Sequence, residues 1–172
     1  MRNRLGLTGA LVILVIVAAG GVAVWTATCP CDRTPGFVLL GDVQEKPVTD
    51  WSFANDVHLC QIQIYAGWRP HAVNLNCMAT PEGELFLSCS TCASKYWAGH
   101  VSQNESARLR LNGVVYPVVL NRVLDPAMLD RAWAARVKKL QVHGDASNPT
   151  PAPDAKRPDG WWSFQVRSAG VS

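Results

Sequence analysis

The sequence predicts a mainly β, α+β protein: a small antiparallel barrel with two helices, preceded by one N-terminal transmembrane helix. First, residues 5–28 form a long run without any charge. Second, several later segments alternate apolar and polar residues, which is typical of half-buried strands. Third, the Thr80–Gly83 turn and Asn112-Gly113 join such segments into hairpins. The 172 residues provide for about one folded domain.

The uncharged run is bounded by Arg4 and Asp32, and as a helix it would span roughly 36 Å. We therefore expect residues 1–28 to be a cytoplasmic stub and a helix that contacts the lipid bilayer through residues 5–28. A cleaved signal peptide is the alternative, although the residues before Cys29 contain no clear Ala-x-Ala cleavage site. The basic N-terminal flank predicts a cytoplasmic N-terminus and an external body. In a bacterium this is a single-pass inner-membrane protein with a periplasmic domain.

Composition argues against a nucleic-acid partner. The chain is 48% hydrophobic and 17% charged, with a net charge of +3. Arg2 and Arg4 precede the apolar run, so 16 − 2 = 14 basic residues remain beyond it, together with all 13 acidic residues. The body is therefore nearly neutral and offers no electrostatic footprint for DNA or RNA.

Residues 29–49 read as a juxtamembrane segment with a first strand at 37–40, and residues 50–172 read as the barrel. Its expected elements are, in order, strands at 58–65, 72–78 and 84–89, a short helix at 94–104 capped by Ser94, a hairpin of 107–111 with 114–123, a helix from Asp125-Pro126 to about Leu140, a loop at 144–160 and a strand at 161–166. The apolar face of the longer helix contains Met128, Leu129, Ala132, Trp133, Arg136, Val137 and Leu140. Closing the strands into a barrel protects their edges.

All six cysteines lie beyond the apolar run, which suits an oxidising compartment. With Gly83 at a hairpin tip, Cys77 and Cys89 would lie opposite each other, near Cys60 and Cys92. Three interpretations stay open for these four: two disulfides, a zinc or iron–sulfur centre, or a reactive Cys-x-x-Cys pair. Cys29 and Cys31 are expected to bond to the body or to another chain.

Several segments resemble one protein superfamily. They are DWSFAND at 50–56, KYW at 95–97, RLRLNGVVY at 108–116 and VLDP at 123–126. Together they resemble the pyridoxamine 5'-phosphate oxidase-like split β-barrel superfamily, which includes flavin- and deazaflavin-binding reductases. The resemblance covers about residues 50–168.

This resemblance implies a split β-barrel that binds FMN or a related flavin, a possible FMN-dependent oxidoreductase activity, and a possible homodimer. It implies that basic and hydroxyl side chains near the second strand and the short helix hold the flavin phosphate. The matching positions here are Arg69, His71, Ser88, Ser90, Ser94 and Lys95, with Trp97 as the tryptophan assigned to the cofactor. Two alternatives remain: a non-catalytic exported accessory module stabilised by disulfides, or a cysteine-ligated metal-binding protein.

Overall fold

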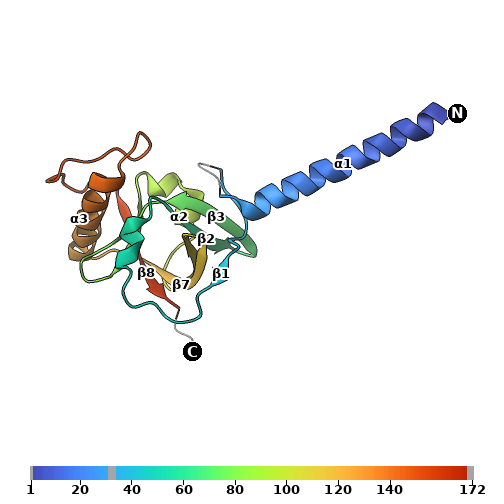
Figure 1. The fold of residues 1–172 in the computed structure, drawn as a ribbon. Coiled ribbons are helices and arrows are strands. Elements are labelled where there is room, and N and C mark those ends of the chain that lie inside the picture. The colour runs from blue at the N-terminus through green and yellow to red at the C-terminus, as the bar shows by residue number, and fades with distance from the viewer. Residues whose placement is uncertain (1, 31–33, 170–172) are drawn as a thin grey trace.

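A curled antiparallel sheet forms the body, and one long helix projects from it (Figure 1). The computed structural model describes residues 2–30 and 34–169. The helical elements are α1 (Arg2–Thr28), η1 (Ser52–Asp56), η2 (Cys92–Ser94), α2 (Tyr96–Gly99) and α3 (Pro126–His143). The strands are β1 (Asp42–Val43), β2 (Cys60–Ala66), β3 (Arg69–Leu75), β4 (Cys77–Ala79), β5 (Leu85–Cys89), β6 (Glu105–Leu111), β7 (Val114–Arg122) and β8 (Trp162–Ser168).

The strand order explains the curl of the sheet. It runs β3-β2-β6-β7-β8-β5-β4, and the two-residue β1 lies parallel to β7. Only Asn76 separates β3 from β4 along the chain, yet these strands lie at opposite ends of the order. The sheet must therefore curl until its two edges approach. This confirms the predicted antiparallel barrel class, in the form of a half-barrel.

A disulfide joins Cys60 of β2, the strand next to the β3 edge, to Cys77 of β4, the opposite edge strand. The Cα atoms are 6.0 Å apart, and both side chains are fully buried in the main hydrophobic core. The bridge connects strands near the two opposite ends of the strand order, so it fixes the curl covalently.

The prediction of one strand over 72–78 is wrong, because Asn76 interrupts it. The Asn76 side chain is buried and its amide donates a hydrogen bond to Asn148 Oδ1. The chain leaves one sheet edge at Leu75 and joins the other at Cys77. The preceding turn is also shorter than expected: Gly67, in the left-handed region with φ +63°, allows β3 to begin already at Arg69.

The predicted first strand at 37–40 is also absent. The backbone N–H of Leu39 donates to Gln63 Oε1 at 2.8 Å instead of joining a ladder. Leu39 itself is fully buried against Ala72 and Val115. A buried side-chain amide thus takes the hydrogen bond that a neighbouring strand would have provided.

The Thr80–Gly83 turn is confirmed, but its register differs from the prediction. Thr80 N–H donates to the carbonyl of Glu84 at 2.9 Å, which centres the turn on residue 82 and not on Gly83. Cys77 therefore pairs with Leu87, and Cys89 pairs with Trp162 of β8. The expectation that Cys77 and Cys89 lie opposite each other is wrong.

Two other local predictions hold, and the predicted helix over 94–104 is shorter than expected, because α2 spans only Tyr96–Gly99. Asn112 and Gly113 both adopt positive φ and join β6 to β7, as an Asn-Gly hairpin requires. The Asp125 carboxylate accepts a hydrogen bond from Met128 N–H and caps α3. The predicted Ser94 cap is wrong: Ser94 Oγ donates to the Thr91 carbonyl within the turn of η2.

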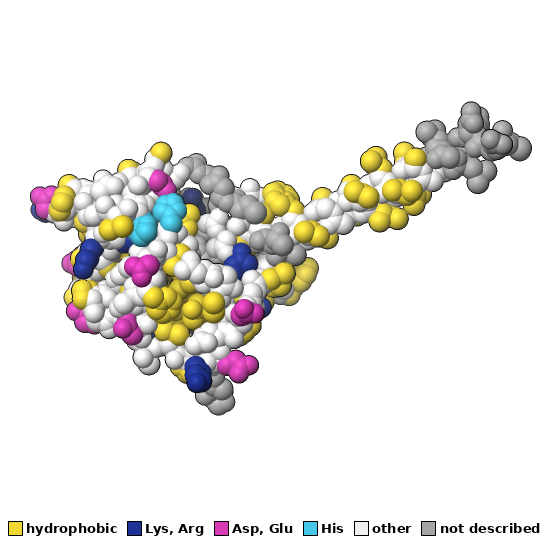
Figure 2. Space-filling view, in the orientation of Figure 1, with side chains coloured by type: hydrophobic (Ala, Val, Ile, Leu, Met, Phe, Trp, Pro, Cys, Tyr) yellow, Lys and Arg dark blue, Asp and Glu magenta, His cyan; other side chains and the backbone are white. Residues whose placement is uncertain are grey.

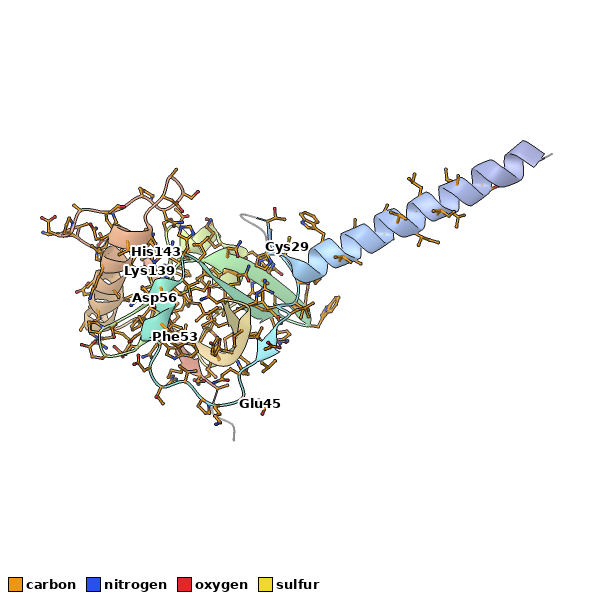
Figure 3. The ribbon with its side chains drawn as sticks, viewed as in Figure 1. Cys29, Glu45, Phe53, Asp56, Lys139 and His143 are labelled. Carbon is orange, nitrogen blue, oxygen red and sulfur yellow. A yellow bond between two sulfur atoms is a disulfide. The ribbon has the colours of Figure 1, made fainter. Side chains whose placement is uncertain are left out.

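The helix α3 covers η1 and β4 and brings a buried lysine with it. Lys139 Nζ donates to the carbonyl oxygen of Ala54 at 2.9 Å and to that of Cys77. Figure 3 shows Lys139 and His143 on α3 facing η1, which carries Asp56. Burial lowers the pKa of Lys139 to about 8, although the charge of Asp56 opposes this shift.

The long helix α1 stands apart from the body (Figure 1), and hydrophobic side chains surround it (Figure 2). Its Thr8–Trp25 segment has a mean hydropathy of 2.3 and no buried residue. By length and composition it can cross a membrane, and a signal sequence has the same properties. At its base, Gln61 Nε2 donates to the carbonyl of Pro30 at 3.1 Å, which ties the end of the helix to β2.

Candidate functional site

A cavity of about 560 Å³ lies where β3, the end of β5, α2 and α3 meet. Residues 34–35, Asn148 and Trp161 complete its wall. The volume falls within the range of small-molecule sites in proteins. The bend at Asn76 helps to form the cavity, because it brings β3 beside the β5 edge of the sheet.

Most of the residues predicted to hold a cofactor meet in this cavity. Its lining includes His71, Ser88, Ser90, Lys95 and Trp97. They come from β3, from the end of β5 and from the segment that starts α2. Sequence positions as far apart as 71 and 97 are thus brought to one wall.

Two predicted residues lie outside the cavity wall. The Arg69 guanidinium is exposed and lies over the Phe37 ring, 5.0 Å from its centroid. Ser94 is engaged in the η2 turn through its bond to the Thr91 carbonyl. Neither is among the residues that line the cavity.

A third basic residue, Arg136, joins Lys95 and His71 in the lining. Its side chain is only 7% exposed, and among the described residues it forms no ion pair and donates no hydrogen bond. It lies over the Trp161 ring, 4.6 Å from the centroid. None of the described residues that line the cavity is Asp or Glu. The described part of the cavity wall therefore concentrates basic side chains without a carboxylate to balance them.

Burial lowers the pKa of two of these basic side chains. Desolvation lowers the pKa of Arg136 to about 10. It also lowers the pKa of His71, and the charges of Arg69 and His100 lower it further. At neutral pH the Arg136 guanidinium keeps its charge, and that charge is poorly solvated.

Two buried donors are also unpaired. Ser88 Oγ and Trp161 Nε1 have no hydrogen-bond partner among the described residues, and both residues line the cavity. An unpaired buried polar group costs about 1–3 kcal/mol, so such groups are few in native proteins. An acceptor placed in the cavity would satisfy donors of this kind.

The aromatic residue that offers a free surface is Tyr96. It is 54% exposed, and its ring centroid lies 4.9 Å from that of His71 and 4.4 Å from that of His100. Trp97, the predicted cofactor residue, is 5% exposed and packs against Phe164 at 5.0 Å. Trp97 lines the cavity mainly as part of the core.

The cysteines form disulfides. Cys60 is bonded to Cys77 and Cys89 to Cys92, and Cys29 is also disulfide-bonded. The four-thiolate metal site is therefore not formed in this oxidised structure. Across residues 2–30 and 34–169, no group of three or more His, Cys, Asp or Glu could hold a metal ion. The prediction for Cys31 lies outside the described residues.

Sequence reasoning missed Arg136, Trp161 and Tyr96 as cavity residues. One signal for Arg136 was present, because it lies on the otherwise apolar face of the predicted helix at 125–140. A charged residue on a buried face needs a partner or a function.

Comparisons with known proteins give no family assignment. No protein-family model matches the chain, and no curated protein matches it. Among solved structures, the chain is similar to the FAD binding protein from Mycobacterium smegmatis, with 14% identity and a TM-score of 0.40. The match covers 71% of this chain and 88% of that one. A likeness this distant carries no conclusion about the ligand, so the fold rests on the strand order described above.

Proposed function

We propose that the half-barrel binds a small anionic ligand in this cavity, with FMN or a related flavin as the first candidate, and that α1 holds the protein at a membrane. The observation that carries the proposal is Arg136, a buried residue that has no carboxylate partner within residues 2–30 and 34–169 and that lines a cavity whose described wall contains no Asp or Glu.

The energetic reason is the cost of burying a charge. Removing a guanidinium from water costs several kcal/mol unless an opposite charge and hydrogen bonds compensate it. A phosphate or carboxylate near Arg136 would supply both, and it would also accept from Ser88 Oγ or Trp161 Nε1. The cavity is therefore suited to an anion.

The residues fit a flavin phosphate in donor chemistry. Arg136 and Lys95 provide cationic donors, His71 provides an imidazole N–H, and Ser88 and Ser90 provide hydroxyls. The half-exposed Tyr96 ring provides a surface for a planar group. A bound flavin would supply electron transfer, and these side chains would bind and orient it. Oxidoreductase activity follows from the family resemblance as a proposal.

The membrane part of the proposal has separate support. The uncharged Thr8–Trp25 segment, fully exposed in α1, would be costly to leave in water. The disulfides suit an oxidising compartment. Together with the basic flank at Arg2 and Arg4, this supports our proposal that the N-terminus is cytoplasmic and the body external, which in a bacterium is the periplasm. Fractionation of membranes, with the intact mass of the protein, tests whether α1 stays attached.

The test of ligand binding uses the full-length protein purified in detergent. Visible absorbance reports any bound flavin, and calorimetric titration compares FMN with riboflavin, which lacks the phosphate. We expect FMN to bind more tightly than riboflavin, and Arg136→Gln to weaken FMN binding roughly 10–100-fold, the value of a charged hydrogen bond. Arg131→Gln is the matched control, because Arg131 lies on the same helix but is exposed and pairs with Glu84 at 3.3 Å. Equal affinities for FMN and riboflavin, or equal effects of the two substitutions, would refute an anion site at Arg136.

A second function is favoured by the disulfides: a non-catalytic exported module in which the half-barrel holds no cofactor. Colourless protein with intact disulfides and no response to any nucleotide or small anion would support it. The homodimer implied by the resemblance also stays a proposal, and light scattering of the purified protein tests it.

A further inference from the structure

The two disulfides between described cysteines lie in different environments. Cys60–Cys77 joins two strands, and both of its side chains are fully buried. Cys89–Cys92 closes a short loop at the end of β5, with a sequence separation of only 3. Only the second pair reaches a cavity, because Cys89 is among the lining residues.

The two cysteines of the second pair are unequally exposed. Cys89 is partly exposed at the cavity wall, whereas Cys92 is fully buried in the core. A reagent that enters the cavity can therefore reach Cys89 and not Cys92. This asymmetry fixes which sulfur an external thiolate can attack and which must leave.

The loop around Cys92 contains a hydrogen-bond acceptor for a reduced Cys92 thiol. Cys92 Sγ lies 2.8 Å from the carbonyl oxygen of Cys89, and a disulfide sulfur has no proton to donate to it. A Cys92 thiol would have this acceptor already in place. Thr91, between the two cysteines, has φ 49°, a left-handed conformation that costs a non-glycine residue energy.

We propose that Cys89–Cys92 is a thiol–disulfide exchange site that accepts two electrons from a dithiol through the cavity, while Cys60–Cys77 is a structural bridge. Lys95 lies in the same lining, where its ammonium group favours the approach of an anionic thiolate. The inference goes beyond ligand binding at Arg136 and does not depend on it.

The reaction balances with the dithiol as the reductant. One donor thiolate attacks Cys89 Sγ, forming an intermolecular disulfide and breaking the Cys89–Cys92 bond. The electron pair of that bond moves to Cys92 Sγ, which leaves as a thiolate and takes up a proton. The second donor thiolate attacks the donor sulfur of the mixed disulfide and releases Cys89, which is protonated in turn. The donor ends as a disulfide, and Cys89 and Cys92 end as thiols.

The first test compares the two bridges within one molecule. Folded full-length protein in detergent is treated with limiting dithiothreitol, quenched with iodoacetamide at intervals and analysed by peptide mass spectrometry. We expect Cys89 and Cys92 to be alkylated at least about tenfold faster than Cys60 and Cys77, because thiol access decides the rate. Equal rates, or earlier opening of Cys60–Cys77, would overturn the proposal.

The second test uses matched single variants, Cys92→Ala and Cys89→Ala, mixed with oxidised glutathione. Cys92→Ala leaves the accessible thiol and should form the glutathione adduct rapidly, whereas Cys89→Ala leaves the buried thiol and should react at least about tenfold more slowly. Adduct formation at the same rate in both variants refutes the assigned order of attack. Circular dichroism and a thermal melt establish that each variant is folded. A reactive Cys89 in a folded Cys92→Ala protein would indicate that this cysteine has a role beyond stabilising the fold.

Discussion

Replacing Cys60 and Cys77 together by alanine removes the covalent link between β2 and β4, and with it the fastening of the curled sheet. Alanine is the appropriate replacement because both positions are fully buried, and serine would add unpaired hydroxyl groups. Neither cysteine is among the residues that line the cavity at Arg136, so the main effect should be on the free energy of unfolding.

The size of the effect follows from the length of the loop that each disulfide closes. With a sequence separation of 17, loop closure predicts a loss of about 3 kcal/mol for Cys60–Cys77. With a separation of 3, the same relation predicts only about 1.5 kcal/mol for Cys89–Cys92. For a body of this size, about 3 kcal/mol corresponds to a decrease of roughly 10 °C in Tm.

The assay is urea unfolding of the full-length protein in detergent, followed by tryptophan fluorescence and circular dichroism. The Cys89→Ala/Cys92→Ala double variant is the matched control. We expect the Cys60 and Cys77 double variant to have the lower midpoint, with a difference of about 1.5 kcal/mol between the two. A control variant that is equally or more destabilised would refute the assignment of the sheet-closing role to Cys60–Cys77.

Three further predictions concern charge and packing. Arg136→Met should raise the free energy of unfolding, measured without added ligand, by about 1–2 kcal/mol. The substitution removes a desolvated cation and loses only the contact with the Trp161 ring. A lower free energy of unfolding in denaturant titration would contradict this. Because the folded-state pKa of Lys139 is about 8 and its ordinary value is 10.5, the unfolded chain holds more protons between these pH values, so stability should rise by about 2 kcal/mol from pH 8 to pH 10. Lys139→Met should abolish this rise, and an unchanged pH profile would disprove the link. Gly36→Ala should destabilise the junction between α1 and the body, because the alanine Cβ would lie 1.7 Å from the Cys29 carbonyl oxygen. The rate of protease cleavage near residue 30 measures this effect. A cleavage rate equal to that of the unsubstituted protein would contradict the prediction.

Most elements could be predicted from the sequence because their signals are local. Asn112-Gly113 determines a hairpin through backbone conformation alone, and Asp125 followed by proline determines where α3 begins. The strand pattern also predicted the barrel class, since alternation reports burial on one face. These signals require no knowledge of distant partners.

The errors arose where a distant partner decides the local structure. Asn76 leaves the ladder because Asn148, far along the chain, accepts its amide hydrogen bond. Leu39 is kept out of a strand by Gln63. The same limit applied to the cavity: His71, Ser90 and Lys95 could be proposed from the resemblance, but Arg136 joins them only through the packing of α3.

The segment that follows α1 forms part of the cavity wall and also connects α1 to the body. Thr34 and Pro35 are part of the cavity wall, and Gly36 forms a two-way backbone bridge with Ala72 of β3. A soluble version cut at residue 36 would therefore lose a side of its own binding pocket along with its hydrophobic stem. Cleavage between residues 28 and 34 would spare that wall, so the position of the cut decides whether a negative binding result carries information.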